Sequence, residues 1–207
     1  MIGRRTLRRD PPTEQNGTVA HPISLVMNDD LKRSRLTVLF RLLLAIPHLF
    51  WLWAFSLAAF FVAVINWFAT MITGHGQAGM HDFLARYVRY TTHLSAYLGL
   101  VANPFPRFVG EPSRYPVDID VDGPERQSRW VTAFRPVLAL PALVIAYIFG
   151  LMVVYVALLG WFVALVIGRT PKGMRDLSAY CLRYRAQTLA YVILLTSRYP
   201  TLNAVSA

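Results

Sequence analysis

The sequence has little cysteine, little acid and, over two long stretches, no formal charge at all. Its single cysteine, Cys181, excludes an internal disulfide and a cysteine-rich metal site. Only 15% of the 207 residues are charged, whereas soluble domains carry roughly a quarter. The stretches 48–72 and 142–167 contain no Asp, Glu, Lys or Arg over 25 and 26 residues. Because a spanning helix needs about 20 apolar residues, both stretches are predicted to cross a membrane.

Recognisable catalytic motifs are also missing. The sequence has no nucleophile elbow, no HExxH pair, no P-loop and no GxGxxG, so we expect no enzymatic activity and no cofactor. The run Asp118-x-Asp120-x-Asp122 resembles the opening of a calcium loop, but Arg129 stands where the loop needs its twelfth-position glutamate. We therefore interpret this run as the polar face of a strand and expect no metal site.

The charge that is present is mostly positive. Lys and Arg total 21 against 11 acids, which gives a net charge of +10. These positive side chains flank the apolar stretches, a pattern typical of membrane topology signals and of contact with anionic headgroups. With no motif that reads DNA or RNA, membrane lipids rather than nucleic acid are the expected partner.

The chain is organised as two copies of one unit, offset by 94 residues without a gap. Residues 21–108 and 115–202 share about 26 identical positions, which indicates tandem duplication. The recurring positions of the first copy are Trp67, Phe68, Gly74, Gly79, Met80, Asp82, Arg89, Tyr90, Ala96 and Tyr97. The predicted divisions are an N-terminal basic arm (1–20), a first repeat (21–110), a linker (111–114), a second repeat (115–202) and a tail (203–207).

Each repeat is predicted to contain four successive parts. A short extended segment (21–28 or 115–122) comes first, and the two copies could pair with each other. An interfacial helix (35–46 or 129–140) then ends at Pro47 or Pro141, where the proline kinks the chain into the bilayer. The apolar span and a glycine turn follow, and Asp82 or Asp176 caps the next helix.

The last helix of each repeat covers 83–102 or 177–196 and is barely long enough to cross. We expect it to span, with a half-embedded interfacial helix as the alternative. The predicted fold is therefore an all-α membrane protein, a tandem duplication of a two-helix transmembrane hairpin with about four transmembrane helices. With two crossings per repeat, 14 of the 21 basic residues lie on the side of the termini. This bias predicts a multi-pass plasma-membrane protein with both termini in the cytoplasm.

One polar stripe is the candidate site. Arg89, Tyr90 and Tyr97 recur as Arg183, Tyr184 and Tyr191 along an otherwise apolar helix. Ionisable groups at membrane depth face the protein interior and pair, and Asp82 and Asp176 are the expected partners. The stripe is interpreted either as a polar pathway or headgroup pocket, or as a hydrogen-bonded stripe that fixes helix packing. Separate candidates for contacts with lipid headgroups are Arg35, Arg41, Arg129 and Arg135.

The run YPVDIDVDGPERQSRW at 115–130, with FRPVLALP, the GMxD turn and the RY…AY…YP ending, resembles an uncharacterised bacterial membrane family. This family is known as a domain of unknown function that is often duplicated in one chain. The resemblance covers residues 21–202 and is closer for the second copy, because Ser24 and Val26 replace acids in the first. It implies a plasma-membrane location and a tandem arrangement, and it transfers no site residue.

Two functions remain open from the sequence. The first is a non-enzymatic accessory or scaffold subunit that docks on other membrane-protein subunits of a larger envelope or transport complex. The alternative is a small transporter, channel or lipid-handling protein that uses the polar stripe between the repeats.

Overall fold

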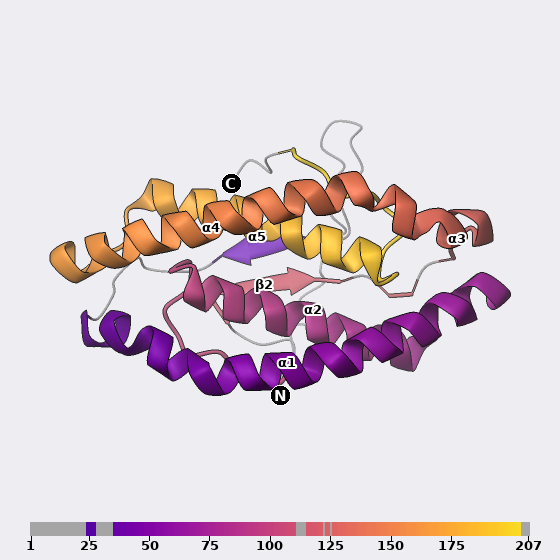
Figure 1. Cartoon of the computed structure of the whole chain (residues 1–207), viewed down its shortest axis with the longest axis horizontal. Coiled ribbons are helices and arrows are strands. Elements are labelled where there is room, and N and C mark those ends of the chain that lie inside the picture. The colour runs from indigo at the N-terminus through magenta and orange to yellow at the C-terminus, as the bar shows by residue number, and fades with distance from the viewer. Residues whose placement is uncertain (1–23, 28–34, 111–114, 122, 125, 204–207) are drawn as a thin grey trace, which may run out of the picture.

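A computed structural model describes residues 24–27, 35–110, 115–121, 123–124 and 126–203. The basic arm, the linker 111–114 and all but the first residue of the tail lie outside this part of the chain. The described chain is mostly helical, with five helices and two short strands (Figure 1). In order, the elements are β1 (Ser24–Met27), α1 (Arg35–Thr73), α2 (Ala78–Leu98), β2 (Val117–Asp120), α3 (Arg129–Leu138), α4 (Leu140–Ile167) and α5 (Lys172–Val192).

The two prolines predicted to kink the chain behave differently. α1 continues through Pro47 as one helix of 39 residues, so the predicted boundary between an interfacial helix and a span is wrong in the first repeat. The second repeat does break, at Ala139, and α4 begins at Leu140 with Pro141 in its first turn. The second repeat also carries Pro136 inside α3. Two prolines five residues apart remove two hydrogen bonds from adjacent turns, whereas α1 loses only one.

The predicted glycine turns are confirmed, and the predicted aspartate caps are wrong. Gly74 and Gly168 end α1 and α4 with φ of 80° and 78°, a left-handed conformation that glycine adopts without a steric penalty. The following helices begin earlier than predicted, at Ala78 and Lys172. Asp82 and Asp176 therefore lie more than one turn inside α2 and α5, where no free N–H group remains to be capped.

The two strands form an antiparallel ladder, as the sequence suggested. Leu25 pairs with Ile119, and these two residues are equivalents at the repeat offset of 94. The flanking pairs, Ser24 with Asp120 and Val26 with Asp118, exchange when the repeats are exchanged. This register is the one expected if a two-fold axis passes through the ladder and relates the two repeats.

Two tryptophans repeat the same symmetry at the ends of the long helices. Trp67 Nε1 donates to the carbonyl of Thr132 at 2.8 Å, and Trp161 Nε1 donates to the carbonyl of Val38 at 2.9 Å. The end of α1 therefore lies beside the start of α3, and the end of α4 lies beside the start of α1. α1 and the α3–α4 pair run antiparallel, as Figure 1 shows.

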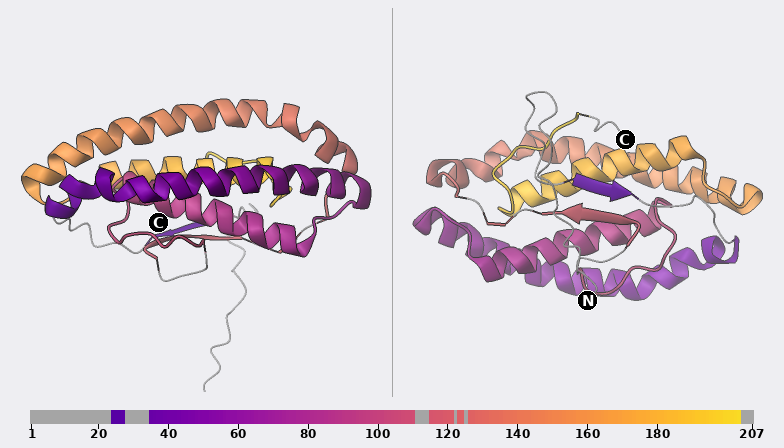
Figure 2. Two further views of the ribbon diagram at one scale, coloured as in Figure 1. Left: turned by 60° about the horizontal axis from the view of Figure 1, so that its bottom comes forward. Right: turned by 180° about the vertical axis from the view of Figure 1, so that it is seen from behind.

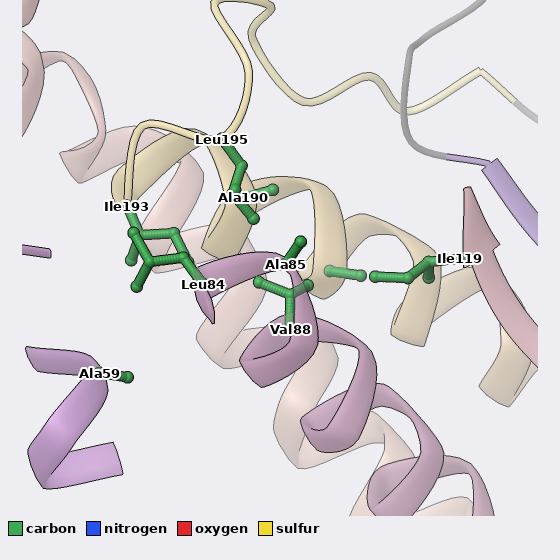
Figure 3. Packing of buried hydrophobic residues seen from close by; sticks show 9 residues of the cluster. Ala59, Leu84, Ala85, Val88, Ile119, Ala190, Ile193 and Leu195 are labelled. Atoms are coloured by element: carbon green, nitrogen blue, oxygen red, sulfur yellow. The ribbon is translucent and has the colours of Figure 1, made fainter. Parts of the chain in front are cut away.

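The elements are arranged in layers. α1, α3 and α4 lie on one face, and the ladder lies on the opposite face between α2 and α5 (Figures 1 and 2). Between these faces the repeats share a hydrophobic core, in which Ala59 of α1, Val88 of α2, Ile119 of β2 and Ala190 of α5 belong to one cluster (Figure 3). Each repeat thus completes the core of the other.

Among the described helices, α1 and α4 are long and apolar enough to cross a membrane. The qualifying segments are Val38–Thr73 and Leu140–Ile167, and only 11% of each apolar window is buried inside the protein. α2 and α5 do not qualify, and most of their side chains are buried against other elements. Of the four predicted spans, length and composition support two.

Candidate functional site

The polar stripe of the first repeat docks on the second strand. Arg89 Nε donates to Asp118 Oδ1 at 2.9 Å, and Arg89 Nη2 donates to the carbonyl of Ile119 at 2.9 Å. His93 Nε2 lies 3.2 Å from the same Asp118 oxygen. The ring of Tyr115 stacks on His93 with centroids 4.4 Å apart. Asp118 thus joins helix α2 to strand β2, which belong to different repeats.

The surroundings of Asp118 keep its carboxylate ionised. Burial alone raises the pKa of Asp118, but hydrogen bonds from His93 and the Ile119 N–H, together with the charge of Arg89, outweigh this effect. The net result is a pKa below the ordinary value of 3.8. The cluster is a satisfied, charge-assisted contact with 22% of the Asp118 side chain exposed.

The acid partners predicted for the stripe are wrong. The side chain of Asp82 is 77% exposed and its nearest basic neighbour is His81, at 3.9 Å. Asp176 pairs with its sequence neighbour Arg175 at 2.8 Å. In both repeats the arginine that the acid was expected to meet binds another segment instead, namely Asp118 for Arg89 and the Asn203 carbonyl for Arg183.

The second repeat uses the equivalent arginine differently. Arg183 Nη2 donates to the carbonyl of Asn203, and its guanidinium lies 5.4 Å from the centroid of the Tyr180 ring. Gln187, which replaces His93, accepts a hydrogen bond from the Thr201 N–H at 3.1 Å. The sequence has Ser24 at the position equivalent to Asp118. The stripe therefore holds a strand acid in one repeat and the C-terminal segment in the other.

The tyrosines of the stripe are packed side chains. Tyr90 is buried and its hydroxyl lies 2.9 Å from His48 Nδ1 and 3.2 Å from the His48 carbonyl. The equivalent Tyr184 packs edge-on against Phe149, with centroids 5.2 Å apart. Tyr97 and Tyr191 lie under the guanidinium groups of Arg41 and Arg135, respectively. These contacts fit the packing interpretation of the stripe.

Arg41 and Arg135 do not reach lipid headgroups, contrary to the prediction. They are only 2% and 1% exposed. Arg41 donates through Nη1 to the carbonyls of Tyr97 and Ala102, and Arg135 donates to those of Tyr191 and Thr196 at 3.0 and 2.8 Å. The physical cause is the C-terminal end of α2 and α5, where carbonyl groups lack intrahelical donors and attract cations.

The other two predicted headgroup contacts are Arg129 and Arg35. Arg129 is exposed at the start of α3, as a headgroup contact requires. The side chain of Arg35 lies outside the described part of the structure. The headgroup contacts of Arg35 and Arg129 remain predictions.

An apolar cavity near the repeat boundary does not touch the stripe. It has a volume of about 580 Å³, and its wall is formed by residues of α1, α2, α3 and α5 and by Ile193. The only polar side chains in its wall that hydrogen-bond to each other are Ser56 and Tyr87, 3.0 Å apart. Its lining is Ser56, Ala59, Phe60, Ala63, Val64, Trp67, Tyr87, Pro136, Leu189, Val192 and Ile193.

Sequence reasoning missed Asp118 as the partner of Arg89 and missed the two tryptophan contacts. Asp118 was recognised as a polar strand residue, but only one repeat has an acid at this position. The tryptophans did carry a signal, because both recur at the offset of 94. A tryptophan near the end of an apolar stretch is also typical of a membrane interface, and only the three-dimensional arrangement shows which carbonyl each indole contacts.

The repeat seen in sequence and structure matches one family twice. A profile of a domain of unknown function, DUF4389, matches residues 35–109 and again residues 129–202. The chain belongs to the DUF4389 family. The tandem arrangement is thereby confirmed. The first DUF4389 copy covers α1 and α2, the second covers α3, α4 and α5, and neither includes the strand that precedes it. No curated protein and no solved structure matches the chain.

Proposed function

We propose that this DUF4389 protein is a non-enzymatic membrane subunit that docks on a larger membrane complex. The observation that carries the proposal is the opposite character of its two faces. The face made by α1, α3 and α4 exposes bulky apolar side chains throughout, whereas α2 exposes Asp82 and Arg86. An exposed apolar face such as that of α1, α3 and α4 is stable only against lipid or another apolar surface. The polar side, which includes α2, is then free to bind a partner protein.

The exposed apolar side chains are concentrated on one set of elements. Outside α1, α3 and α4, the described residues expose few large hydrophobic side chains, namely Phe105, Phe108, Val109, Leu177, Tyr199 and Leu202. Exposed cations occur where the apolar helices begin or end, including Arg129, Arg169 and Lys172. Cations at these positions suit anionic headgroups, and the plasma membrane is the proposed location.

The test is purification in mild detergent from native membranes, followed by native gel electrophoresis. The proposal expects the chain to migrate in a complex of defined stoichiometry. A charge reversal on the polar face, Arg86→Glu, is expected to weaken that complex, whereas Arg107→Glu in the loop after α2 serves as a matched exposed control. A solitary particle in the wild-type preparation would overturn the subunit role.

A second candidate, lipid handling, is favoured by the apolar cavity. Its volume of about 580 Å³ and its lining suit an acyl chain. Ala63 lines the cavity, and Ala58 of the same helix is exposed. Ala63→Phe is expected to reduce the lipid that co-purifies with the protein, measured by mass spectrometry, and Ala58→Phe to leave it unchanged. Equal lipid retention by the two variants would exclude the cavity as the binding place.

A further inference from the structure

We propose that the protein lies in the plane of a single leaflet, with α1 and the α3–α4 pair parallel to the membrane surface and the strand ladder facing water. The inference rests on the proposed membrane role and replaces crossing by in-plane insertion. It is carried by the length of the apolar face, by the route of the chain between the repeats and by the position of the ladder.

The apolar face is too long for a crossing helix. Val38–Thr73 has 36 residues and is about 54 Å long at 1.5 Å per residue, against a hydrocarbon core of about 30 Å. Its exposed apolar side chains extend from Leu39 at 49% to Ile72 at 69% exposure. Burying this length across one bilayer needs a tilt of about 55°, beyond the range of roughly 0–40° found for spanning helices.

The chain between the repeats starts beside one end of α1 and arrives at the other end. Arg41, near the start of α1, binds the carbonyls of Tyr97 and Ala102, so α2 ends there. At the other end, Gln127 N–H donates to the carbonyl of Gly74 at 3.0 Å. The described residues between these two points, 103–110, 115–121, 123–124 and 126, therefore belong to a connection between opposite ends of α1, and they include Arg107, Asp118, Asp120 and Arg126.

Such a segment cannot lie in hydrocarbon. If α1 crossed the membrane along its axis, this charged and largely non-helical segment would have to cross beside it. A lone two-stranded ladder leaves outer backbone groups without ladder partners, which the bilayer core does not tolerate. The ladder lies midway along the long helices (Figure 1), so a crossing geometry would place it at the bilayer midplane.

In-plane insertion removes each of these conflicts. The two-fold axis through Leu25 and Ile119 then lies along the membrane normal, and the equivalent helices of both repeats reach the same depth. The ladder lies on the face opposite α1 and α4 (Figure 2). The helices that flank the ladder, α2 and α5, expose Asp82, Arg86 and Lys172.

Three glycines report the topology. Gly79, Gly123 and Gly173 are exposed, and a Cβ added at any of them meets nothing within 4 Å. Each is changed to Cys in a Cys181→Ser background, which removes the sole native cysteine, itself buried. An impermeant maleimide is then applied to intact host cells and to inverted membrane vesicles.

The three positions distinguish three arrangements. In-plane insertion expects all three cysteines to be labelled from the same side. Helices that cross along their axes in this fold would place Gly79→Cys and Gly173→Cys on opposite sides, since α1 and α4 are antiparallel. Tandem transmembrane hairpins would place these two on one side and Gly123→Cys on the other. Either of the last two patterns overturns the inference and leaves the membrane role intact.

A second measurement does not depend on surface labelling. Nitroxides at Leu43, Phe60 and Ile72, which are 61%, 61% and 69% exposed, report depth along α1 by collision with oxygen and with a water-soluble nickel chelate. In-plane insertion expects all three within one leaflet, whereas a crossing helix places the middle deep and the ends in opposite headgroup regions. Recovery of the wild-type chain in the soluble fraction would instead refute the proposed membrane role itself.

Discussion

Arg135 is the largest side chain that the structure buries completely, and at the residue scale it reinforces the C-terminal cap of α5. Its guanidinium donates to the carbonyls of Tyr191 and Thr196 and lies 4.5 Å from the centroid of the Tyr191 ring. Leu194, in this turn, has a φ of 68°, an unfavourable conformation for a non-glycine residue. The contact with Arg135 thus holds together a turn that its own backbone does not favour.

Removing this guanidinium has a predictable cost. Arg135→Met keeps the apolar stem but takes the guanidinium donor away from the Thr196 carbonyl, and it leaves the Tyr191 carbonyl with only the Leu194 N–H as a donor. A buried group left unsatisfied costs about 1–3 kcal/mol, and a lost hydrogen bond to a charged donor adds to this cost. We expect the free energy of unfolding to fall by about 2–4 kcal/mol, measured by denaturation in mild detergent. Arg129→Met, on the same helix at an exposed position, is the control and is expected to change stability by less than about 0.5 kcal/mol.

Asp118 makes a stability contribution that depends on pH. Its pKa is lowered in the folded state, so its contribution is full above the ordinary pKa of 3.8 and is lost as pH falls through the lower folded value. Asp118→Asn is expected to lower stability by about 2 kcal/mol at pH 7, and the difference from wild type should shrink below pH 4. Thermal unfolding midpoints at pH 7 and pH 3 measure this. The exposed Asp82→Asn is the control, and a pH-independent difference for Asp118→Asn would contradict the charge-based account.

At the scale of elements, two glycines with opposite surroundings predict opposite effects of the same substitution. A Cβ at Gly110 would fall on the backbone carbonyl of Arg86 in α2, whereas a Cβ at Gly79 meets nothing within 4 Å. Gly110→Ala is expected to displace the 103–110 segment from α2 and to destabilise by more than about 2 kcal/mol. Gly79→Ala, inside α2, is expected to stabilise by about 0.5–1 kcal/mol. Chemical denaturation measures both, and equal effects would show that the close approach is absent.

The elements that the sequence predicted best are those determined by local patterns. The uncharged stretches predicted the apolar helices, Gly74 and Gly168 predicted their ends, and the repeat predicted the strand pairing. The continuation of α1 through Pro47 was not predictable, because a single proline bends or ends a helix according to the packing around it. The packing around Pro47, rather than the proline itself, therefore determines that α1 continues.

Contacts between distant segments account for the errors at the candidate site. Arg41 meets carbonyls 56 and 61 residues further along the chain, and nothing near Arg41 in sequence indicates them. Arg89 likewise does not pair with Asp82, seven residues away, but binds Asp118 in the other repeat. Spacing along one helix identified the inward-facing arginines but not the element that each one faces.

At the scale of the whole molecule, the two repeats behave as the halves of a dimer joined in one chain. Hydrogen bonds cross between them at both ends of the long helices, through Trp67 and Trp161. The ladder crosses at the centre, and the hydrophobic core of Figure 3 takes residues from both halves. Few of these contacts depend on the covalent connection between the repeats.

Cutting that connection is therefore expected to leave the molecule assembled. With a protease site inserted into 111–114 and an affinity tag on the C-terminal half, cleavage in mild detergent should leave both halves co-eluting in equal amounts. Trp67→Phe with Trp161→Phe removes both indole donors while keeping aromatic rings, at about 1 kcal/mol per lost hydrogen bond. The cleaved double variant should then separate at a lower denaturant concentration than the control Trp53→Phe, whose native side chain is 72% exposed. Spontaneous separation of the wild-type halves would show that the connection, rather than the symmetric contacts, holds the repeats together.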